Sequence, residues 1–371
     1  MKPEVIEFKV GSPLARTPAP APASTPQTVT DLDALKDSIM ARFQTRLYAR
    51  GEVVVPSVPS LVDYYVQGFD EIFTAIGKKF TPEELEVLRG ILLSQLEQGF
   101  AASPHSNVIL RYEPSDTGGI SYNISNLVAS MTDQYKTWVD TREPPLFGSH
   151  PDTKLLEVAK SLGSPNQINQ INILDIGAGT GRNTLPLARM GYAVDALEMT
   201  AIFAEQIEAE VQKEQLPVRV YNADILSPLV RMAPAYYSLA VAAEVISHFR
   251  NADQLRLLLA KMCDGLHSGG LFLFNTFLAT DGYEPDQLAR EMSEVNWSTI
   301  FTYEDLAYAM HDLPLQFIEE IPVYDYEKSH LPAEAWPPTG WFDNWANGRD
   351  LFWLPDQKPP MELRWILCRR L

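Results

Sequence analysis

Three glycines stand close together near the middle of the chain, in the sequence NILDIGAGTGRN at residues 172–183. Gly177, Gly179 and Gly181 follow a short apolar run and precede an amphipathic stretch, which is the order strand, turn and helix. Glycine allows a tight turn and a close approach of a ligand to the backbone, and a helix N-terminus favours a negative group. The pattern therefore predicts a loop that binds an adenosine-bearing ligand.

An acidic residue stands where the next strand of such a unit would end. Glu198 follows Gly181 by 17 residues, and a carboxylate there can accept hydrogen bonds from both hydroxyls of a ribose. The alternative is a surface glutamate that caps the next helix. The dinucleotide fingerprint requires a third glycine at the sixth position from Gly177, where this chain has Arg182. This bulky side chain disfavours a nicotinamide oxidoreductase.

The segment LDIGAGTGRNTLPLA resembles the first motif of the class I S-adenosylmethionine-dependent methyltransferases. YNADIL, AVAAEVISHF and LHSGGLFLFNTF resemble later motifs of the same family, in order, with Ser268 in place of the usual proline. The resemblance covers residues 150–371 and implies S-adenosylmethionine as the cofactor. The cofactor-binding residues that it implies are Asp175, Gly177, Ala178, Gly179, Gly181, Arg182, Asn183, Glu198, Met199, Asp224, Ile225 and Ala243.

The resemblance also implies individual roles. Asp224 would accept a hydrogen bond from the adenine amino group, and Ile225 would pack on the ring. Asp175 either lies near the amino group of the ligand or only orients the loop. Asp195, inside the second strand of the domain, is expected to support the sheet instead of touching the ligand.

Catalysis of methyl transfer requires few residues, because a sulfonium donor is already activated and the enzyme mainly aligns the acceptor and excludes water. A hydroxyl or amide acceptor would benefit from a general base. His248 is the best-placed imidazole, and Glu244 is a second candidate. The alternative for His248 is packing or helix capping. The six histidines are scattered without the spacing of a metal site, so no metal is expected.

Two segments outside these motifs are expected to select the acceptor. Residues 135–152 would form a lid, or else a domain linker, and an aromatic insertion at about 328–360 would carry binding anchors, or else core residues. The segment after the fifth strand of the domain also emerges on the ligand side. The candidate substrate-binding residues are Tyr135, Trp138, Arg142, His150, Asn275, Tyr283, Trp336 and Trp341.

The elements that must position these residues alternate from residue 151 to residue 371 between apolar strands and amphipathic helices. This alternation predicts an α/β fold with a Rossmann-like, doubly wound and mostly parallel sheet. The last two strand-like runs, 315–326 and 361–370, have no helical crossover between them, so they are expected to close the sheet as an antiparallel edge pair.

The N-terminal part of the chain, residues 1–150, differs in composition from residues 151–371. Residues 1–30 include a Pro- and Ala-rich stretch that predicts a disordered leader. Residues 31–150 predict a mainly helical accessory domain, with a short hairpin possible within 102–125. One of its helices would start at Thr81 as N-cap, followed by Pro82 and by Glu84 at the capping-box position.

Composition limits the partners and the compartment. The net charge of −18 disfavours nucleic acid and an anionic membrane surface. Two cysteines and the lack of a signal-peptide core or a long apolar run predict a cytoplasmic, soluble protein.

The sequence therefore predicts methyl transfer from S-adenosylmethionine to a nitrogen or oxygen of a small molecule or a protein, by in-line attack on the donor methyl group. A protein side-chain N-methyltransferase of the phycobiliprotein-asparagine type is one alternative. The other is a non-catalytic binding or interaction module with the same fold.

Overall fold

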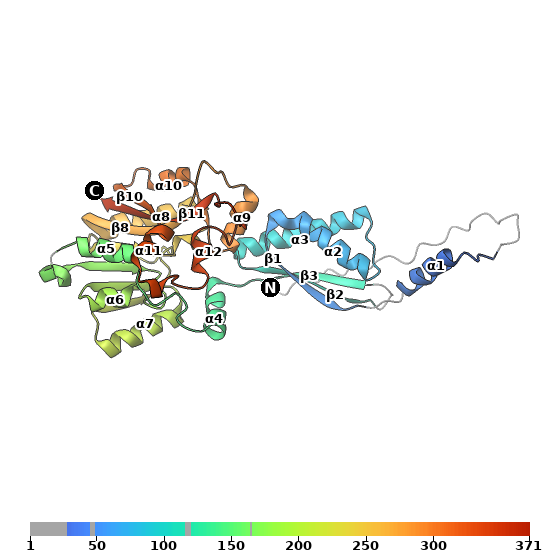
Figure 1. The fold of residues 1–371 in the computed structure, drawn as a ribbon, viewed down its shortest axis with the longest axis horizontal. Coiled ribbons are helices and arrows are strands. Elements are labelled where there is room, and N and C mark those ends of the chain that lie inside the picture. The colour runs from blue at the N-terminus through green and yellow to red at the C-terminus, as the bar shows by residue number, and fades with distance from the viewer. Residues whose placement is uncertain (1–27, 45–48, 116–119, 164) are drawn as a thin grey trace. The chain divides into compact units, whose positions relative to one another are not determined.

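The structure, a computed structural model, describes residues 28–44, 49–115, 120–163 and 165–371. The chain divides into two compact units, residues 1–131 and 132–371, which Figure 1 colours from blue to cyan and from green to red. The division falls at the start of α4 (Met131–Thr141), so this helix belongs almost wholly to the second unit and not to an N-terminal domain that ends near residue 150. Residues 1–27 of the expected leader lie outside the described part of the chain.

The first unit contains helices and a small sheet. Its elements are α1 (Leu32–Gln44), β1 (Gly51–Pro56), a 3-10 turn (Pro59–Leu61), α2 (Val62–Ala75), α3 (Pro82–Ala102), β2 (Asn107–Pro114) and β3 (Ile120–Leu127). The sheet is antiparallel in the order β1-β2-β3. The hairpin of β2 and β3 was expected from the sequence, whereas β1 was not. Its valine run favours a strand despite the prolines around it.

Helix α3 starts at the cap that the sequence predicts. The amide of Glu84 donates to Thr81 Oγ1 at 3.2 Å, and the amide of Thr81 donates to Glu84 Oε2 at 2.9 Å. Behind this cap, Leu92 and Leu96 of α3 pack with Phe73 of α2 and with the sheet in the core of the unit. The first unit therefore has a hydrophobic core of its own.

The second unit is built on one large sheet (Figure 1). The strand order is β10-β11-β8-β7-β4-β5-β6, and β9 pairs with β8. Neighbouring strands from β6 to β8 are parallel, whereas β11 is antiparallel to both β8 and β10. This confirms the predicted Rossmann-like α/β sheet with an antiparallel edge pair. The strands are β4 (Asn172–Ile176), β5 (Ala193–Glu198), β6 (Val218–Asn222), β7 (Tyr237–Ala242), β8 (Leu266–Ala279), β9 (Ile300–Phe301), β10 (Leu315–Pro322) and β11 (Met361–Arg370).

Helices cover both faces of this sheet. Ile173 of β4 packs in one core cluster with Leu155 of α5 (Thr153–Ser161) and Leu187 of α6 (Thr184–Arg189), while its neighbour Leu174 packs in another with Leu258 of α8 (Ala252–Gly265). Successive side chains of a strand point to opposite faces, so each face has its own layer of helices. The helices after α4 are α5 (Thr153–Ser161), α6 (Thr184–Arg189), α7 (Ala201–Glu214), α8 (Ala252–Gly265), α9 (Gln287–Val295), α10 (Tyr303–Met310), α11 (Val323–His330) and α12 (Phe342–Ala346).

One predicted strand is shorter than expected. The run at 315–326 is not one strand, because β10 ends at Pro322 and the residues VYDY begin α11. The proline fixes the backbone at this point and has no amide hydrogen for a neighbouring strand.

In the part of the chain that the structure describes, no helix has the length and apolar character needed to span a bilayer.

Candidate functional site

The glycine-rich loop lies between β4 and α6 and depends on its glycines. Gly177, Gly179 and Gly181 have φ angles of +67°, +54° and +86°, a region that other residues rarely adopt. A Cβ atom on Gly177 would also lie 2.4 Å from a methyl carbon of Val245. The amide of Gly177 donates to the carbonyl of Leu197 at 2.7 Å, which ties the loop to β5.

Glu198 joins the end of β5 to the same loop. Its Oε2 accepts from the amide of Gly179 at 2.8 Å, and its Oε1 accepts from the amide of Thr200 at 2.7 Å. The residue is only 4% exposed. Burial raises the pKa of Glu198, and the hydrogen bonds from the two amides oppose that rise. The acidic residue expected at this position therefore touches the glycine loop directly.

Asp175 lies under the loop, buried in β4. Its Oδ2 accepts from the hydroxyl of Thr184, the first residue of α6, at 2.5 Å. Burial raises the pKa of Asp175 to about 7, against the opposing hydrogen bond from Thr184. This contact is the one expected of a carboxylate that orients the loop. Asp195, by contrast, pairs with Arg219 on the neighbouring strand and supports the sheet, as expected.

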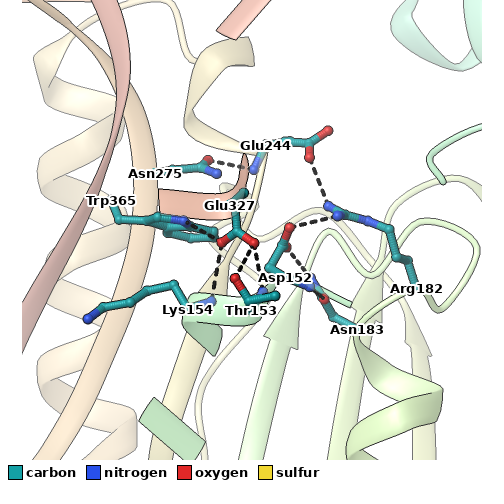
Figure 2. Close-up of polar contacts among 9 residues, drawn as sticks. All are labelled: Asp152, Thr153, Lys154, Arg182, Asn183, Glu244, Asn275, Glu327 and Trp365. Atoms are coloured by element: carbon teal, nitrogen blue, oxygen red, sulfur yellow. Dashed lines mark hydrogen bonds and ion pairs between the residues drawn. The ribbon is translucent and has the colours of Figure 1, made fainter. Parts of the chain in front are cut away.

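Arg182, at the end of the loop, bridges two carboxylates (Figure 2). Its Nη1 lies 2.7 Å from Asp152 Oδ1 and its Nη2 lies 2.8 Å from Glu244 Oε1. Asn183 adds a double contact with Asp152, donating to its Oδ2 at 2.8 Å and accepting from its amide at 3.0 Å. Burial acts to lower the pKa of Arg182, but the two carboxylates outweigh it and the pKa is raised. The guanidinium therefore stays charged.

Glu244 follows β7 in an unusual backbone conformation. Its φ angle is +59°, and its amide donates to the buried Oδ1 of Asn275 on β8 at 2.6 Å. Burial raises the pKa of Glu244 to about 7, although Arg182 acts to lower it. Non-glycine residues with positive φ persist where the surroundings hold them, often at functional sites. Asn275 and Glu244, both predicted site residues, are thus brought together.

Aromatic side chains gather above the loop. Tyr135 and Trp138 of α4 lie within 5.5 Å of each other between ring centroids, and the Tyr135 hydroxyl lies 3.4 Å from His248 Nε2. Phe147 approaches Gly179, where an added Cβ would lie 3.3 Å from its ring. Burial raises the pKa of Tyr135, and the charges of Glu198 and Glu244 add to the rise. Two further members, Phe203 and Trp297, complete this cluster.

The residues expected on the adenine side are placed near the end of β6. Asp224 is exposed and its Oδ1 accepts from the amide of Leu226 at 2.8 Å. Ile225 is buried in the core cluster on the side of α8. Met199 is 41% exposed and Ala243 is half-buried.

Arg142 and His150, two further candidates for substrate binding, have different surroundings. The Arg142 guanidinium stacks 3.9 Å from the ring centroid of Trp138. Arg142 also lines a pocket of about 580 Å³. Thr180 and Gly181 of the glycine loop line it too, together with residues of α6, of α7 and of the segment 139–149. His150 contacts the neighbouring Ser149 through Nδ1.

The aromatic insertion is mostly core. Trp345 and Phe342 are buried, and Trp336 and Trp341 pack against the same cluster, which also contains strand residues of the sheet. Tyr283 packs there as well, edge to face with Phe352. Of the tryptophans in the insertion, Trp353 is the exposed one, at 76%. Trp336 and Trp341, expected as binding anchors, and Tyr283, expected to line the pocket, are all partly buried and make these core contacts.

Several residues of this site were not predicted from the sequence. Phe147, Phe203 and Trp297 lie in three distant segments, and nothing in their spacing links them. Glu327 lies in α11 and accepts hydrogen bonds at the start of α5. Asp152 carried a weak signal, because Asp is a favoured N-cap residue and a helix starts at Thr153.

Comparisons with known proteins found matches to the part of the chain that forms the sheet and its loops. Residues 173–270 match a family model described as a methyltransferase domain. Over 99 residues the chain is 30% identical to a ubiquinone biosynthesis O-methyltransferase of Rickettsia typhi, a match that covers 25% of this chain and 36% of that protein. The chain thus spans little more than a third of the length of this curated relative.

Two solved structures resemble the chain at lower identity. A geranyl diphosphate methyltransferase in complex with S-adenosylmethionine is 15% identical, with a TM-score of 0.41, over 58% of this chain and 85% of that one. A putative sarcosine dimethylglycine methyltransferase from Galdieria sulphuraria is 13% identical, with a TM-score of 0.44, over 65% and 98%.

Proposed function

We propose that this chain, whose residues 173–270 match the family model of a methyltransferase domain, is a class I S-adenosylmethionine-dependent methyltransferase that transfers a methyl group from that cofactor to a nitrogen or oxygen atom of an acceptor. The observation that carries the proposal is the contact between Glu198 and Gly179. It joins a glycine-rich turn to a buried carboxylate at the carboxyl ends of two adjacent parallel strands, which is where open α/β sheets bind their ligands.

The charges around the loop suit this cofactor, which carries a sulfonium and an ammonium group. Glu198, Glu244 and Asp175 are carboxylates near the loop, and the guanidinium of Arg182 is already shared between Asp152 and Glu244. Each oxygen of Glu198 accepts a hydrogen bond from one backbone amide and has a further lone pair that can accept from a ribose hydroxyl. Asp224 and Ile225 would contact the adenine, and Ala243 would lie beside the methionine part.

When bound, S-adenosylmethionine supplies a methyl group that needs no further activation. An acceptor nitrogen or oxygen held in line with that methyl group would take it up through a lone pair, with S-adenosylhomocysteine as the leaving group, and would have one proton to give up. The contribution of the chain is to align the acceptor and to exclude water. The aromatic rings of Tyr135, Trp138 and Phe147 beside the loop are suited to exclude water.

Two groups are candidates to receive the proton. His248 lies beside the Tyr135 hydroxyl, and Glu244 has a pKa of about 7, which fits a base at neutral pH. Glu244 is also held in an ion pair with Arg182. A pH profile of kcat that loses its acid limb in His248→Ala, and keeps it in Glu244→Gln, would assign the base to His248.

The acceptor is proposed as a small molecule or a protein, without nucleic acid or membrane as partner. The strongly acidic balance of the chain supports this choice, since phosphate-rich partners need Lys and Arg. The proposed compartment is the cytoplasm, in keeping with two cysteines that are both free thiols.

Isothermal titration with S-adenosylmethionine and with S-adenosylhomocysteine tests the cofactor. We expect both to bind, and absence of binding to both would contradict the proposal. Incubation of the protein and tritiated donor with a lysate of source cells, followed by a search for a labelled product 14 Da heavier, then tests transfer. Binding without any labelled product would favour the binding-module alternative.

A further inference from the structure

The start of α5 has an unusual cap. Asp152 is the N-cap residue of this helix, but its side chain makes no hydrogen bond to the helix amides. Aspartate at an N-cap normally accepts from the second or third amide of its own helix. Here the carboxylate instead faces away from the helix, toward Arg182 and Asn183 at the end of the glycine loop.

Glu327, from the distant helix α11, takes over the task of capping. Its Oε2 accepts from the amide and the hydroxyl of Thr153, at 2.8 and 2.6 Å, and its Oε1 accepts from the amide of Lys154 at 3.2 Å. A negative charge at this end of a helix is also favoured by the helix dipole. The first two amides of α5 are thus satisfied without Asp152.

The Glu327 carboxylate is held firmly in turn. Trp365 of β11 donates its Nε1 hydrogen to Oε1 at 3.1 Å, and both residues are 1% exposed. The four groups that bond to Glu327, on the three residues Thr153, Lys154 and Trp365, all donate, so the position needs a group that only accepts, which a carboxylate is and an amide is not. Burial raises the pKa of Glu327, the nearby charge of Asp152 adds to the rise, and the hydrogen bonds from Thr153 and Lys154 oppose it.

The contacts form one continuous chain across the second unit (Figure 2). Glu327 caps α5, Asp152 reaches Arg182, Arg182 reaches Glu244, and Glu244 is held by Asn275. Asn275 of β8 and Trp365 of β11 are opposite each other in the sheet register. The network therefore begins and ends on neighbouring positions of two paired strands.

We propose that Glu327 is a positioning residue for cofactor binding: by capping α5 in place of Asp152, it frees the Asp152 carboxylate to clamp the end of the glycine loop. This inference rests on the proposed function. Glu327 does not touch the loop itself and acts through Asp152. Without the Glu327 carboxylate, Asp152 can turn back to cap its own helix, and Arg182 and Asn183 lose that partner.

The experiment compares Glu327→Gln with Val323→Ala, a buried position on the same helix that has no polar contact with Asp152. Both variants lower the melting temperature, so stability alone does not distinguish them. Hydrogen exchange followed by mass spectrometry in the free protein measures the amides of residues 177–184. We expect faster exchange there in Glu327→Gln, and wild-type exchange in Val323→Ala.

Titration with S-adenosylmethionine and S-adenosylhomocysteine gives the second measurement. We expect Glu327→Gln to weaken both affinities about ten-fold, the effect of losing one charge-assisted contact, and Val323→Ala to leave them unchanged. The double variant Glu327→Gln, Asp152→Ala should exchange no faster than Asp152→Ala alone, because the two act in series.

The outcomes separate the two proposals. Loop exchange and cofactor affinity that stay at the wild-type level in Glu327→Gln would overturn the positioning role, whatever happens to the melting temperature. If the wild-type protein binds neither compound, the proposed function fails, and loop exchange still decides whether Glu327 controls the loop.

Discussion

Arg182 Nη2 lies 2.8 Å from Glu244 Oε1, which joins the end of the glycine loop after β4 to the loop after β7. The two side chains are 8% and 16% exposed. The same guanidinium also reaches Asp152, and its planar fork can serve two carboxylates at once where a lysine ammonium is a single point charge. The residue that excludes a dinucleotide fingerprint is thus the centre of the ion-pair network at the site.

Removal of this guanidinium should be costly. Arg182→Ala leaves Asp152 and Glu244 buried without their partner, so we expect a loss of about 3–5 kcal/mol in the free energy of unfolding. Arg189→Ala is the control, because its pair with Glu214 is 48% and 30% exposed and is screened by solvent. Denaturant titrations of both variants make the comparison. Similar losses in the two variants would show that the Arg182 network adds no stability.

Asp175 should make stability depend on pH. Its pKa is raised from 3.8 to about 7, so the folded state binds the proton more tightly than the unfolded chain. The stability due to the protonated form is complete below about pH 4 and is lost as pH rises to 7. In Asp175→Asn the amide oxygen can still accept from Thr184, and nothing ionises.

The variant should therefore gain stability over wild type as pH rises from 4 to 7, up to about 4 kcal/mol, the equivalent of the pKa shift. Melting temperatures of both proteins at pH 5 and pH 8 measure this gain. A difference that is the same at both values would mean that Asp175 does not titrate in this range.

Glu198 should control affinity for the cofactor. In Glu198→Gln, the amide group would point NH₂ toward the amide hydrogen of Gly179 or Thr200, which now both donate to the carboxylate. We expect S-adenosylmethionine to bind at least about ten-fold more weakly, equivalent to ~1.5 kcal/mol. Isothermal titration measures the change, with Glu205→Gln on the exposed side of α7 as the control. Equal affinity in both variants would remove Glu198 from the binding site.

The tryptophans of the insertion should differ sharply in their effect on stability. Trp345 is 6% exposed and packs edge to face on Phe277 of the sheet, so Trp345→Ala should cost about 3–5 kcal/mol. Trp353 is largely in solvent, and Trp353→Ala should leave stability within about 0.5 kcal/mol. Thermal melting of the two variants is the test. A large loss at Trp353 would mean that its ring is packed in solution.

Local patterns were sufficient for much of the fold. The cap at Thr81 and Glu84, the strand before Gly177 and the parallel sheet all depend on residues close in sequence or on a repeated texture. The β10 to α11 transition was missed because Leu315 to Tyr326 is apolar enough for a strand throughout, and only the position of Pro322 marks the change. The extra strand β1 was missed for a similar reason, since its flanking prolines resemble a loop.

The positions of the candidate site's residues were predictable where one local motif determines them, and unpredictable where distant segments have to meet. The glycines, Glu198 and Asp175 occupy positions set by two adjacent strands and by the turn and helix that join them. Trp297 and Phe203 meet Tyr135 only because three separate segments converge, and no spacing in the sequence encodes this. The tryptophans at 336 and 341 were placed in an open loop because their segment lies between edge strands, but the insertion folds back on the sheet.

The bond from Thr153 to Glu327 closes a loop of 174 residues. Bringing the ends of so long a segment together costs on the order of 5 kcal/mol in chain entropy. A cap that forms after the sheet between the two helices has assembled does not have to offset this cost, because the sheet has by then brought the two ends together. By the role proposed for Glu327, the clamp of Asp152 on Arg182 and Asn183 is then completed only after the sheet has formed.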